Sequence, residues 1–135
     1  MKKRLYIDAN AVLDFLAMRE LFWVPMAKIV SLAEKKELAI VVSPISFASV
    51  SYLLSKVESH YRILGKLRNF RIVCEVSEIN GQTMDKALKS KFADFEDALQ
   101  YYWLKNQIAI TRNGKDFKES SLPIMTAAEY LKSII

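Results

Sequence analysis

Apolar residues recur along this chain in two alternating patterns. Five short runs rich in β-branched or aromatic residues predict strands, because such side chains suit a pleated, buried surface. Between these runs, apolar residues recur at three- and four-residue spacings, which is typical of helices buried on one face. The predicted strands are 5–7, 38–42, 70–76, 108–111 and 123–125. The predicted helices are 11–18, 25–36, 47–56, 61–67, 83–89, 94–106 and 127–132.

Helix-start signals support two of these assignments. Pro25 suits a first helical turn, and Thr126 followed by Glu129 forms the pattern of a capping box. Strands that alternate with helices of this length predict right-handed crossovers between parallel strands. We therefore expect an α/β fold: a three-layer α/β/α sandwich with a mainly parallel five-stranded sheet. No repeat or shift in composition divides the chain, so residues 1–135 are expected to form a single domain.

Composition narrows the classes of protein. The chain has 135 residues and a net charge of +5, which favours an anionic partner. The single Cys74 lies in an apolar run and is expected to be a buried, reduced thiol, which indicates a cytoplasmic protein. Polar residues after Ile7 argue against a secretion signal. The uncharged stretch 38–55 contains Pro44 and five serines, so no membrane segment is expected.

Candidate functional residues follow the predicted strands. Ligands of open parallel sheets bind at the carboxyl ends of the strands, so those ends carry the most information. The first strand runs into Asp8-Ala9-Asn10, the second into Ser43-Pro44-Ile45-Ser46, and the fourth into Thr111-Arg112-Asn113-Gly114-Lys115-Asp116. The helix before the fourth strand opens with Asp94-Phe95-Glu96-Asp97. Three separate segments can therefore converge on one acidic cleft.

Purely structural interpretations of these residues remain open. Asp94 and Asp97 have the spacing of a helix N-cap and its third residue, where acids are favoured whatever the function. Asn113-Gly114 is a turn signal, and Asp116 can cap a short helix. Asp8 is different, because a carboxylate directly after a buried strand needs solvent, hydrogen bonds or a metal ion.

Together, the acids predict a hard divalent cation. Mg²⁺ prefers carboxylate and water oxygens and needs no His or Cys. The chain has one histidine, His60, and one cysteine, which argues against tetrahedral zinc. We expect His60 to lie on the surface.

Three runs of sequence resemble the PIN domain family. They are Tyr6-Ile7-Asp8-Ala9-Asn10-Ala11-Val12-Leu13-Asp14, Asp94-Phe95-Glu96-Asp97-Ala98-Leu99-Gln100, and Thr111-Arg112-Asn113-Gly114-Lys115-Asp116-Phe117. The C-terminal run Leu122-Pro123-Ile124-Met125-Thr126 with Glu129-Tyr130-Leu131 resembles the last strand and helix of that family. The resemblance spans essentially the whole chain.

This resemblance implies a ribonuclease that depends on Mg²⁺ or Mn²⁺ and hydrolyses RNA phosphodiesters. Members are often the toxin of a bacterial toxin–antitoxin pair and often homodimers. The antitoxin is then expected to cover the cleft. Carried over by position, Asp8, Asp97 and Asp116 would be the catalytic, metal-binding acids. Asn113 stands where the family also places an aspartate.

The resemblance also implies supporting roles. Asp94, Asn10, Ser49, Asn113, Thr111 and Ser46 would act behind the metal ligands, orienting them, water or phosphate. From their position beside the last acidic motif, Arg112 and Lys115 are expected to bind RNA at the rim of the cleft. The sequence departs from the family at Ser49, where members commonly carry a glutamate. A hydroxyl can bind a metal-held water but adds no negative charge.

Three alternatives follow from these residues. Ser49 and Asn113 suggest a catalytically weak PIN-like domain that binds nucleic acid or a partner protein without cleaving RNA. A phosphoacceptor receiver domain would need an aspartate at the end of the third strand, where the sequence has Glu75-Val76-Ser77. A phosphatase of the Asp-x-Asp type would need a second carboxylate where Asn10 stands. The last two rank well below the first.

Overall fold

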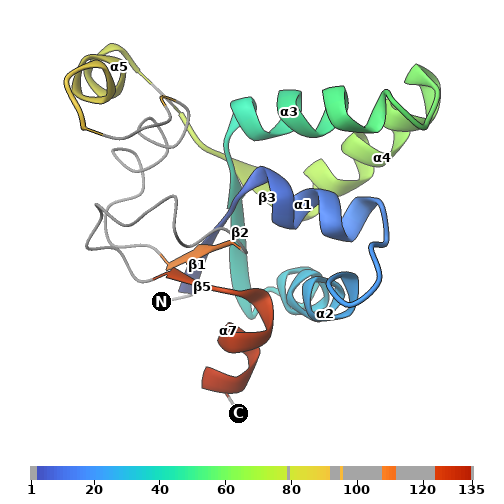
Figure 1. Ribbon diagram of the computed structural model, residues 1–135. Coiled ribbons are helices and arrows are strands. Elements are labelled where there is room, and N and C mark those ends of the chain that lie inside the picture. Colours follow the sequence, from blue (N-terminus) through green and yellow to red (C-terminus); the bar gives the residue numbers. More distant parts are fainter. Residues whose placement is uncertain (1–2, 79, 92–94, 96–107, 112–123, 135) are drawn as a thin grey trace.

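The computed structural model describes residues 3–78, 80–91, 95, 108–111 and 124–134. Figure 1 shows the arrangement of the elements. The strands are β1 (Lys3–Ile7), β2 (Leu38–Val42), β3 (Cys74–Val76), β4 (Ile108–Ile110) and β5 (Ile124–Met125). The helices within the described residues are α1 (Ala9–Leu16), α2 (Trp23–Glu34), α3 (Pro44–Leu54), α4 (His60–Val73), α5 (Gly81–Leu88) and α7 (Ala127–Ser133).

The described strands form one parallel sheet in the order β3-β2-β1-β4-β5. β1 is central: Leu5 is in register with Ile40 of β2 on one side and with Ile108 of β4 on the other. The chain adds β2 and β3 on one side of β1 and then returns to add β4 and β5 on the other. This reversal creates a topological switch point between β1 and β4. The predicted α/β fold with a parallel five-stranded sheet is confirmed.

Both faces of β1 are buried. Leu5 and Ile7 belong to the main hydrophobic core, whereas Tyr6 points to the opposite face and packs with Ala109. Leu5, Tyr6 and Ile7 are each 0% exposed, whereas Lys3 and Arg4 at the start of β1 are exposed. Burial on both faces explains why residues 5–7 form an unbroken apolar run and not an alternating pattern.

Four helices, α1 to α4, lie together beside the sheet, and α5 stands apart from them (Figure 1). α2 contacts α1 and α4 and also α7, so it links the N-terminal helices to the C-terminal one. Buried residues Met26, Ile29 and Val30 form the core-facing stripe of α2. The capping box of α7 is present as predicted: Thr126 Oγ1 accepts from the Glu129 amide, and Glu129 accepts from the Thr126 amide.

The prediction of a strand over 70–76 is wrong for its first four residues. Residues 70–73 are the last turn of α4, and only Cys74–Val76 are extended. The reason is tertiary packing: the Phe70 ring lies 6.0 Å from Phe15 and 6.2 Å from Phe47, centroid to centroid. Ile63, seven residues before Phe70, is buried on the same helical face. These contacts favour the helix over the strand preference of the local residues. The predicted helix 94–106 lies outside the described residues.

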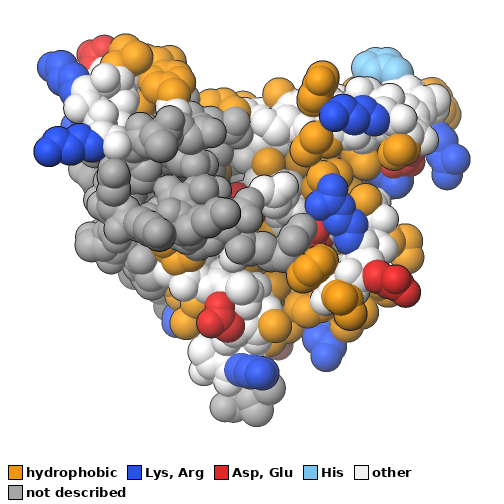
Figure 2. All heavy atoms as spheres, in the orientation of Figure 1, with side chains coloured by type: hydrophobic (Ala, Val, Ile, Leu, Met, Phe, Trp, Pro, Cys, Tyr) orange, Lys and Arg blue, Asp and Glu red, His pale blue; other side chains and the backbone are white. Residues whose placement is uncertain are grey.

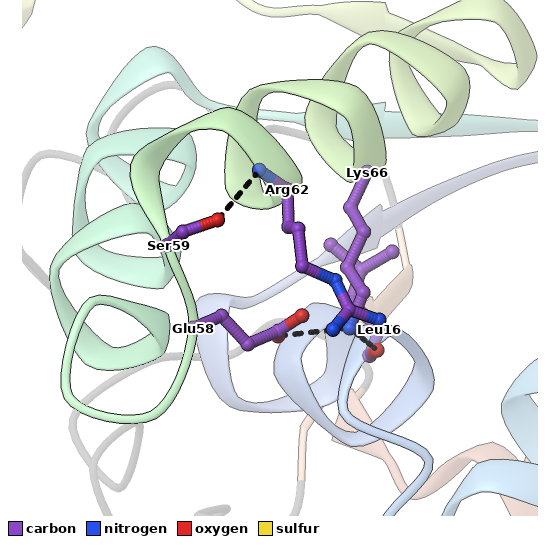
Figure 3. Close-up of polar contacts among 5 residues, drawn as sticks. All are labelled: Leu16, Glu58, Ser59, Arg62 and Lys66. Atoms are coloured by element: carbon purple, nitrogen blue, oxygen red, sulfur yellow. Dashed lines mark hydrogen bonds and ion pairs between the residues drawn. The ribbon is translucent and has the colours of Figure 1, made fainter.

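A polar contact ties α4 to the end of α1 (Figure 3). Lys66 Nζ donates to Glu58 Oε2 at 2.8 Å and to the carbonyl of Leu16 at 3.1 Å. Leu16 is the last residue of α1, where carbonyl groups have no helical partner and a cation is favoured. Lys66 therefore holds the C-terminal end of α1, the helix whose N-cap is Asp8.

Among the described residues, no helix has the length and apolar character needed to cross a membrane. His60 is exposed, as expected, and Cys74 is a buried free thiol, as expected.

Burial should make stability depend on pH through Cys74. Loss of hydration raises the pKa of this thiol from an ordinary value of 9.0 to about 11, although Arg71 acts in the opposite direction. Above pH 9 the unfolded thiol ionises while the folded thiol stays neutral. The free energy of unfolding is expected to fall between about pH 9 and pH 11, by up to about 2 kcal/mol. Urea denaturation of the parent protein and Cys74→Ala at pH 8 and pH 10.5 measures this fall. If the free energy of unfolding falls equally with pH in both proteins, Cys74 is not the cause and the prediction is wrong.

Candidate active site at the β1–β4 switch point

Asp8 stands where β1 ends and α1 begins. It is the N-cap of α1, and its Oδ1 accepts from the backbone amide of Ala11 at 2.9 Å. Its own amide donates to the carbonyl of Ile110 in β4 at 3.2 Å. Asp8 is only 9% exposed, so its carboxylate is held by the protein at the very edge of the core.

Thr111 holds the other carboxylate oxygen. This residue directly follows β4, is 2% exposed, and donates from Oγ1 to Oδ2 of Asp8. Its amide donates to the carbonyl of Met125 in β5 at 3.0 Å, which fixes its backbone. The Thr111 hydroxyl at the end of β4 thus orients the Asp8 carboxylate at the end of β1. The two residues are 103 positions apart in the sequence.

The pair lies where open parallel sheets bind ligands. β1 and β4 are the strands on either side of the switch point, the position where open parallel sheets commonly bind ligands. Asp8 and Thr111 are the first residues beyond those two ends. The sequence-based prediction that both residues come to one edge of the sheet is therefore confirmed.

Serine residues follow β2 at the same edge. Ser43 is the N-cap of α3 and accepts from the Ser46 amide at 3.1 Å, and the two hydroxyls are 3.4 Å apart. Both side chains are at most 1% exposed. Ser49 lies one turn further along α3 and is half-buried, as is Asn10 in the first turn of α1. Ser46 is thus fully enclosed, whereas Ser49 and Asn10 retain access to solvent.

The other predicted site residues lie outside the described residues. They are Asp94, Asp97, Arg112, Asn113, Lys115 and Asp116. The convergence of Asp8 with Asp97 and Asp116 stays a prediction. Within the described part of the chain, no three His, Cys, Asp or Glu residues lie close enough to hold a metal ion.

The oxygen atoms at this edge of the sheet are nevertheless of the type that binds a hard divalent cation. Asp8 and Thr111 present oxygen atoms, and Mg²⁺ is often bound through only one or two carboxylates together with water. The Thr111 hydroxyl donates to this carboxylate and so fixes its orientation, as partners of metal ligands commonly do. Mg²⁺ or Mn²⁺ is therefore compatible with the residues that are described.

Asp14 is a buried acid that the motif analysis did not assign to the site. It is 2% exposed, and Arg19 Nη1 lies 3.5 Å from its Oδ1. Asp14 lines a pocket of about 440 Å³ together with Thr111 and apolar residues of α1, α2 and α7. The sequence signal was present: Asp14 interrupts the apolar face of a helix two turns after Asp8. Only the folded chain shows that this acid faces a cavity.

Charge on the face shown in Figure 2 is dispersed. The lysine and arginine side chains drawn there lie over α5, over the α3–α4 pair, over the α1–α2 region and over α7. The described basic residues of this face form several small groups and no single continuous patch.

Replacement of Asp8 should separate its capping role from its charge. In Asp8→Ala the helix loses its cap and the buried Thr111 hydroxyl loses an acceptor, which is expected to cost about 2 kcal/mol of unfolding free energy. Asp8→Asn keeps an oxygen at the cap and should be destabilised less, because Asn caps helices about as well as Asp. Urea denaturation of both variants tests this order. Equal stability of the Ala and Asn variants would show that the cap contributes nothing.

Comparisons with known proteins complete the description. A model of the PIN domain matches residues 4–114. The fold is similar to a chain in the crystal structure of VapBC2 from Rickettsia felis bound to a DNA fragment from their promoter, with a TM-score of 0.68 and 19% identity over 90% of this chain and 96% of that chain. It is also similar to VapC20 of Mycobacterium tuberculosis, described as a Sarcin-Ricin loop cleaving toxin, with a TM-score of 0.66 and 12% identity over 86% of this chain and 95% of that one. No curated protein matches the sequence.

At such low identities the structural likeness concerns the fold alone. The family match is independent of it and spans both β1 with Asp8 and β4 with Thr111. Because that match covers most of the chain, this protein belongs to the PIN domain family.

Proposed function

We propose that the protein is a divalent-metal-dependent ribonuclease that hydrolyses RNA phosphodiesters. The observation that carries this proposal is the Asp8 carboxylate, buried at the switch point and oriented by the Ala11 amide and the Thr111 hydroxyl. A buried carboxylate held in this way is already desolvated and placed before any ligand arrives, which lowers the cost of binding a cation. Membership of the PIN domain family supports the same activity.

Asp8, Asp97 and Asp116 are the proposed catalytic residues and would hold Mg²⁺ or Mn²⁺. The bound cation would lower the pKa of a water molecule and neutralise charge on the scissile phosphate. Asp8 presents one fixed carboxylate to this site. Thr111 keeps that carboxylate from turning and so acts as a positioning residue.

The remaining predicted residues are proposed to support this arrangement. Arg112 and Lys115 follow Thr111 in sequence and would bind RNA phosphates at the rim. The other proposed supporting residues are Asn10, Ser46, Ser49, Asp94 and Asn113. Because Ser46 is fully enclosed, its role would be to hold Ser43 and the start of α3 and not to touch RNA.

The neighbours in structure suggest a cellular setting. VapC20 is described as a toxin that cleaves the Sarcin-Ricin loop, and VapBC2 was solved with promoter DNA. We propose by analogy that this chain is the toxin of a toxin–antitoxin pair, that RNA is its substrate and that an antitoxin protein covers the crevice. The reduced Cys74 is in keeping with a cytoplasmic location.

Cleavage of RNA provides the direct test. Purified protein is incubated with structured and single-stranded RNAs in Mn²⁺ or Mg²⁺, and products are resolved on denaturing gels. Cleavage is expected with either metal and not with chelator. Asp8→Asn and Asp97→Asn should each lower the rate about 100-fold or more, as removal of well-placed catalytic groups often does.

The matched control is Asp85→Asn, the same change at an exposed position of α5. It should cleave at the parental rate. If both Asp8→Asn and Asp97→Asn cleave RNA as fast as the parent protein, the cleavage comes from a contaminating nuclease and the proposed site is excluded.

One observation favours a second function. Ser49 supplies no charge where family members commonly carry a glutamate, and it is half-buried in α3. A catalytically weak domain that binds nucleic acid or a partner protein would then show RNA binding without turnover. Phosphate-dominated binding should weaken steeply with salt. Binding that does not change in high salt would instead indicate a protein partner.

We also propose that the chain forms one domain and acts as a homodimer. Light scattering after gel filtration should then give twice the 15.5 kDa mass of the chain. Limited proteolysis should release no stable smaller fragment. A mass of one chain across the micromolar range would exclude the dimer, and a stable fragment would exclude the single domain.

A further inference from the structure

The side of α4 that faces away from the core carries large apolar residues. Four residues form one stripe along this side, because they recur at four- and three-residue spacings: Tyr61, Gly65, Arg68 and Ile72. We call them the outer stripe of α4. Tyr61 is 84% exposed and Ile72 is 81% exposed, whereas solvent-facing stripes of helices are usually polar. Contact with another molecule would explain both side chains.

The fold itself gives no reason for the glycine in this stripe. Gly65 lies in the interior of α4 with a negative φ, and a Cβ atom added there would meet no neighbouring atom within 4 Å. Glycine inside a helix lowers stability relative to alanine, because the unfolded chain gains freedom. It is useful where a second backbone has to come close. Gly65 therefore indicates that another helix crosses the outer stripe at this point.

The order of residues in the outer stripe suits a second copy of the same helix. The spacings are four, three and four, so they are the same in both directions. If two copies of α4 pack antiparallel about a two-fold axis, Tyr61 meets Ile72 of the second copy. Gly65 then meets Arg68 of the second copy, whose apolar stem can lie over the glycine. Each large side chain thus has a complementary neighbour, as an interface with two-fold symmetry requires.

The charges of α4 are compatible with this arrangement. The helix contains no acid and four cations, which are Arg62, Lys66, Arg68 and Arg71. In the antiparallel pair Arg62 lies beside Asn69 of the second copy, whose side-chain oxygen can accept its hydrogen bond. Arg71 lies beside Leu64, and Lys66 contacts the end of α1 on the other side of the helix. The arginines that flank the outer stripe therefore have uncharged neighbours across the interface.

We propose that the chain forms a homodimer through the outer stripe of α4, packed antiparallel on the same stripe of a second copy. The inference rests on the homodimer advanced as part of the proposed function and names the surface that forms it. α4 leads into the amino end of β3, whereas Asp8 lies at the carboxyl edge of the sheet. The interface is therefore separate from the candidate active site.

Gly65→Ala should change stability and association in opposite directions. Alanine favours the helix, so the midpoint of thermal unfolding in dilute, monomeric solution should rise by roughly 4 °C. The added methyl group keeps the two helices apart and should weaken the dimer roughly ten-fold in analytical ultracentrifugation. Gly81→Ala in the first turn of α5 is the matched control, because a Cβ atom there also meets nothing within 4 Å. It should dimerise as the parent does. Equal association of both variants would overturn the proposal.

Paired cysteines test the antiparallel register. A chain that carries both Tyr61→Cys and Ile72→Cys should form covalently linked dimers under a mild oxidant, seen on non-reducing gels. Either substitution alone leaves its two new thiols roughly 16 Å apart along the helices and should give no linked dimer. Both parent side chains are exposed, so all three variants are expected to fold. The buried Cys74 is common to all of them. Linking in the double variant that does not exceed that of the single variants would show that the interface lies elsewhere.

Salt distinguishes this contact from a dimer bridged by nucleic acid. The cations of two α4 helices repel one another over longer distances, so the proposed dimer should become tighter as salt rises. A dimer held by a shared nucleic acid would dissociate instead, and that result would overturn the proposal. A parent chain that stays monomeric would exclude both this interface and the homodimer. A dimer without the predicted cysteine link would exclude this interface alone, and RNA cleavage by either form would leave the nuclease proposal standing.

Discussion

The hydrogen bond from Thr111 to Asp8 is the interaction on which the candidate site depends. A carboxylate at the end of a central parallel strand is almost fully buried, so it is tolerable only where donors meet it. The start of α1 supplies one donor and the end of β4 supplies the other. Two requirements of folding, capping a helix and satisfying a buried charge, thereby fix the orientation of this carboxylate.

The remainder of the fold maintains that geometry. β1 is hydrogen-bonded on both sides and buried on both faces, so the backbone before Asp8 has little freedom. The far end of α1 is held by Lys66, which reaches its last carbonyl from α4. Thr111 is held in turn by β5 through its amide. The two strand ends at the switch point are thus rigid supports for the candidate site.

A pocket lies beside Asp8 and shares part of this support. Ala11 and Thr111 both hold the Asp8 carboxylate and line the pocket wall. The shape of the pocket on that side is therefore tied to the orientation of the carboxylate.

The sequence was sufficient to predict the α/β class and the parallel sheet, because both follow from local hydrophobic patterns and from the general rules of chain crossover. It also predicted Asp8 and Thr111 at the carboxyl edge of the sheet, because each residue directly follows a predicted strand. The extent of α4 was decided by tertiary structure, since packing of Phe70 against Phe15 and Phe47 outweighed the strand preference of residues 70–73. The hydrogen bond between Asp8 and Thr111 and the burial of Asp14 beside a cavity were likewise decided there. Such contacts join residues that are distant in sequence or depend on what packs against a helix, and no local pattern contains that information.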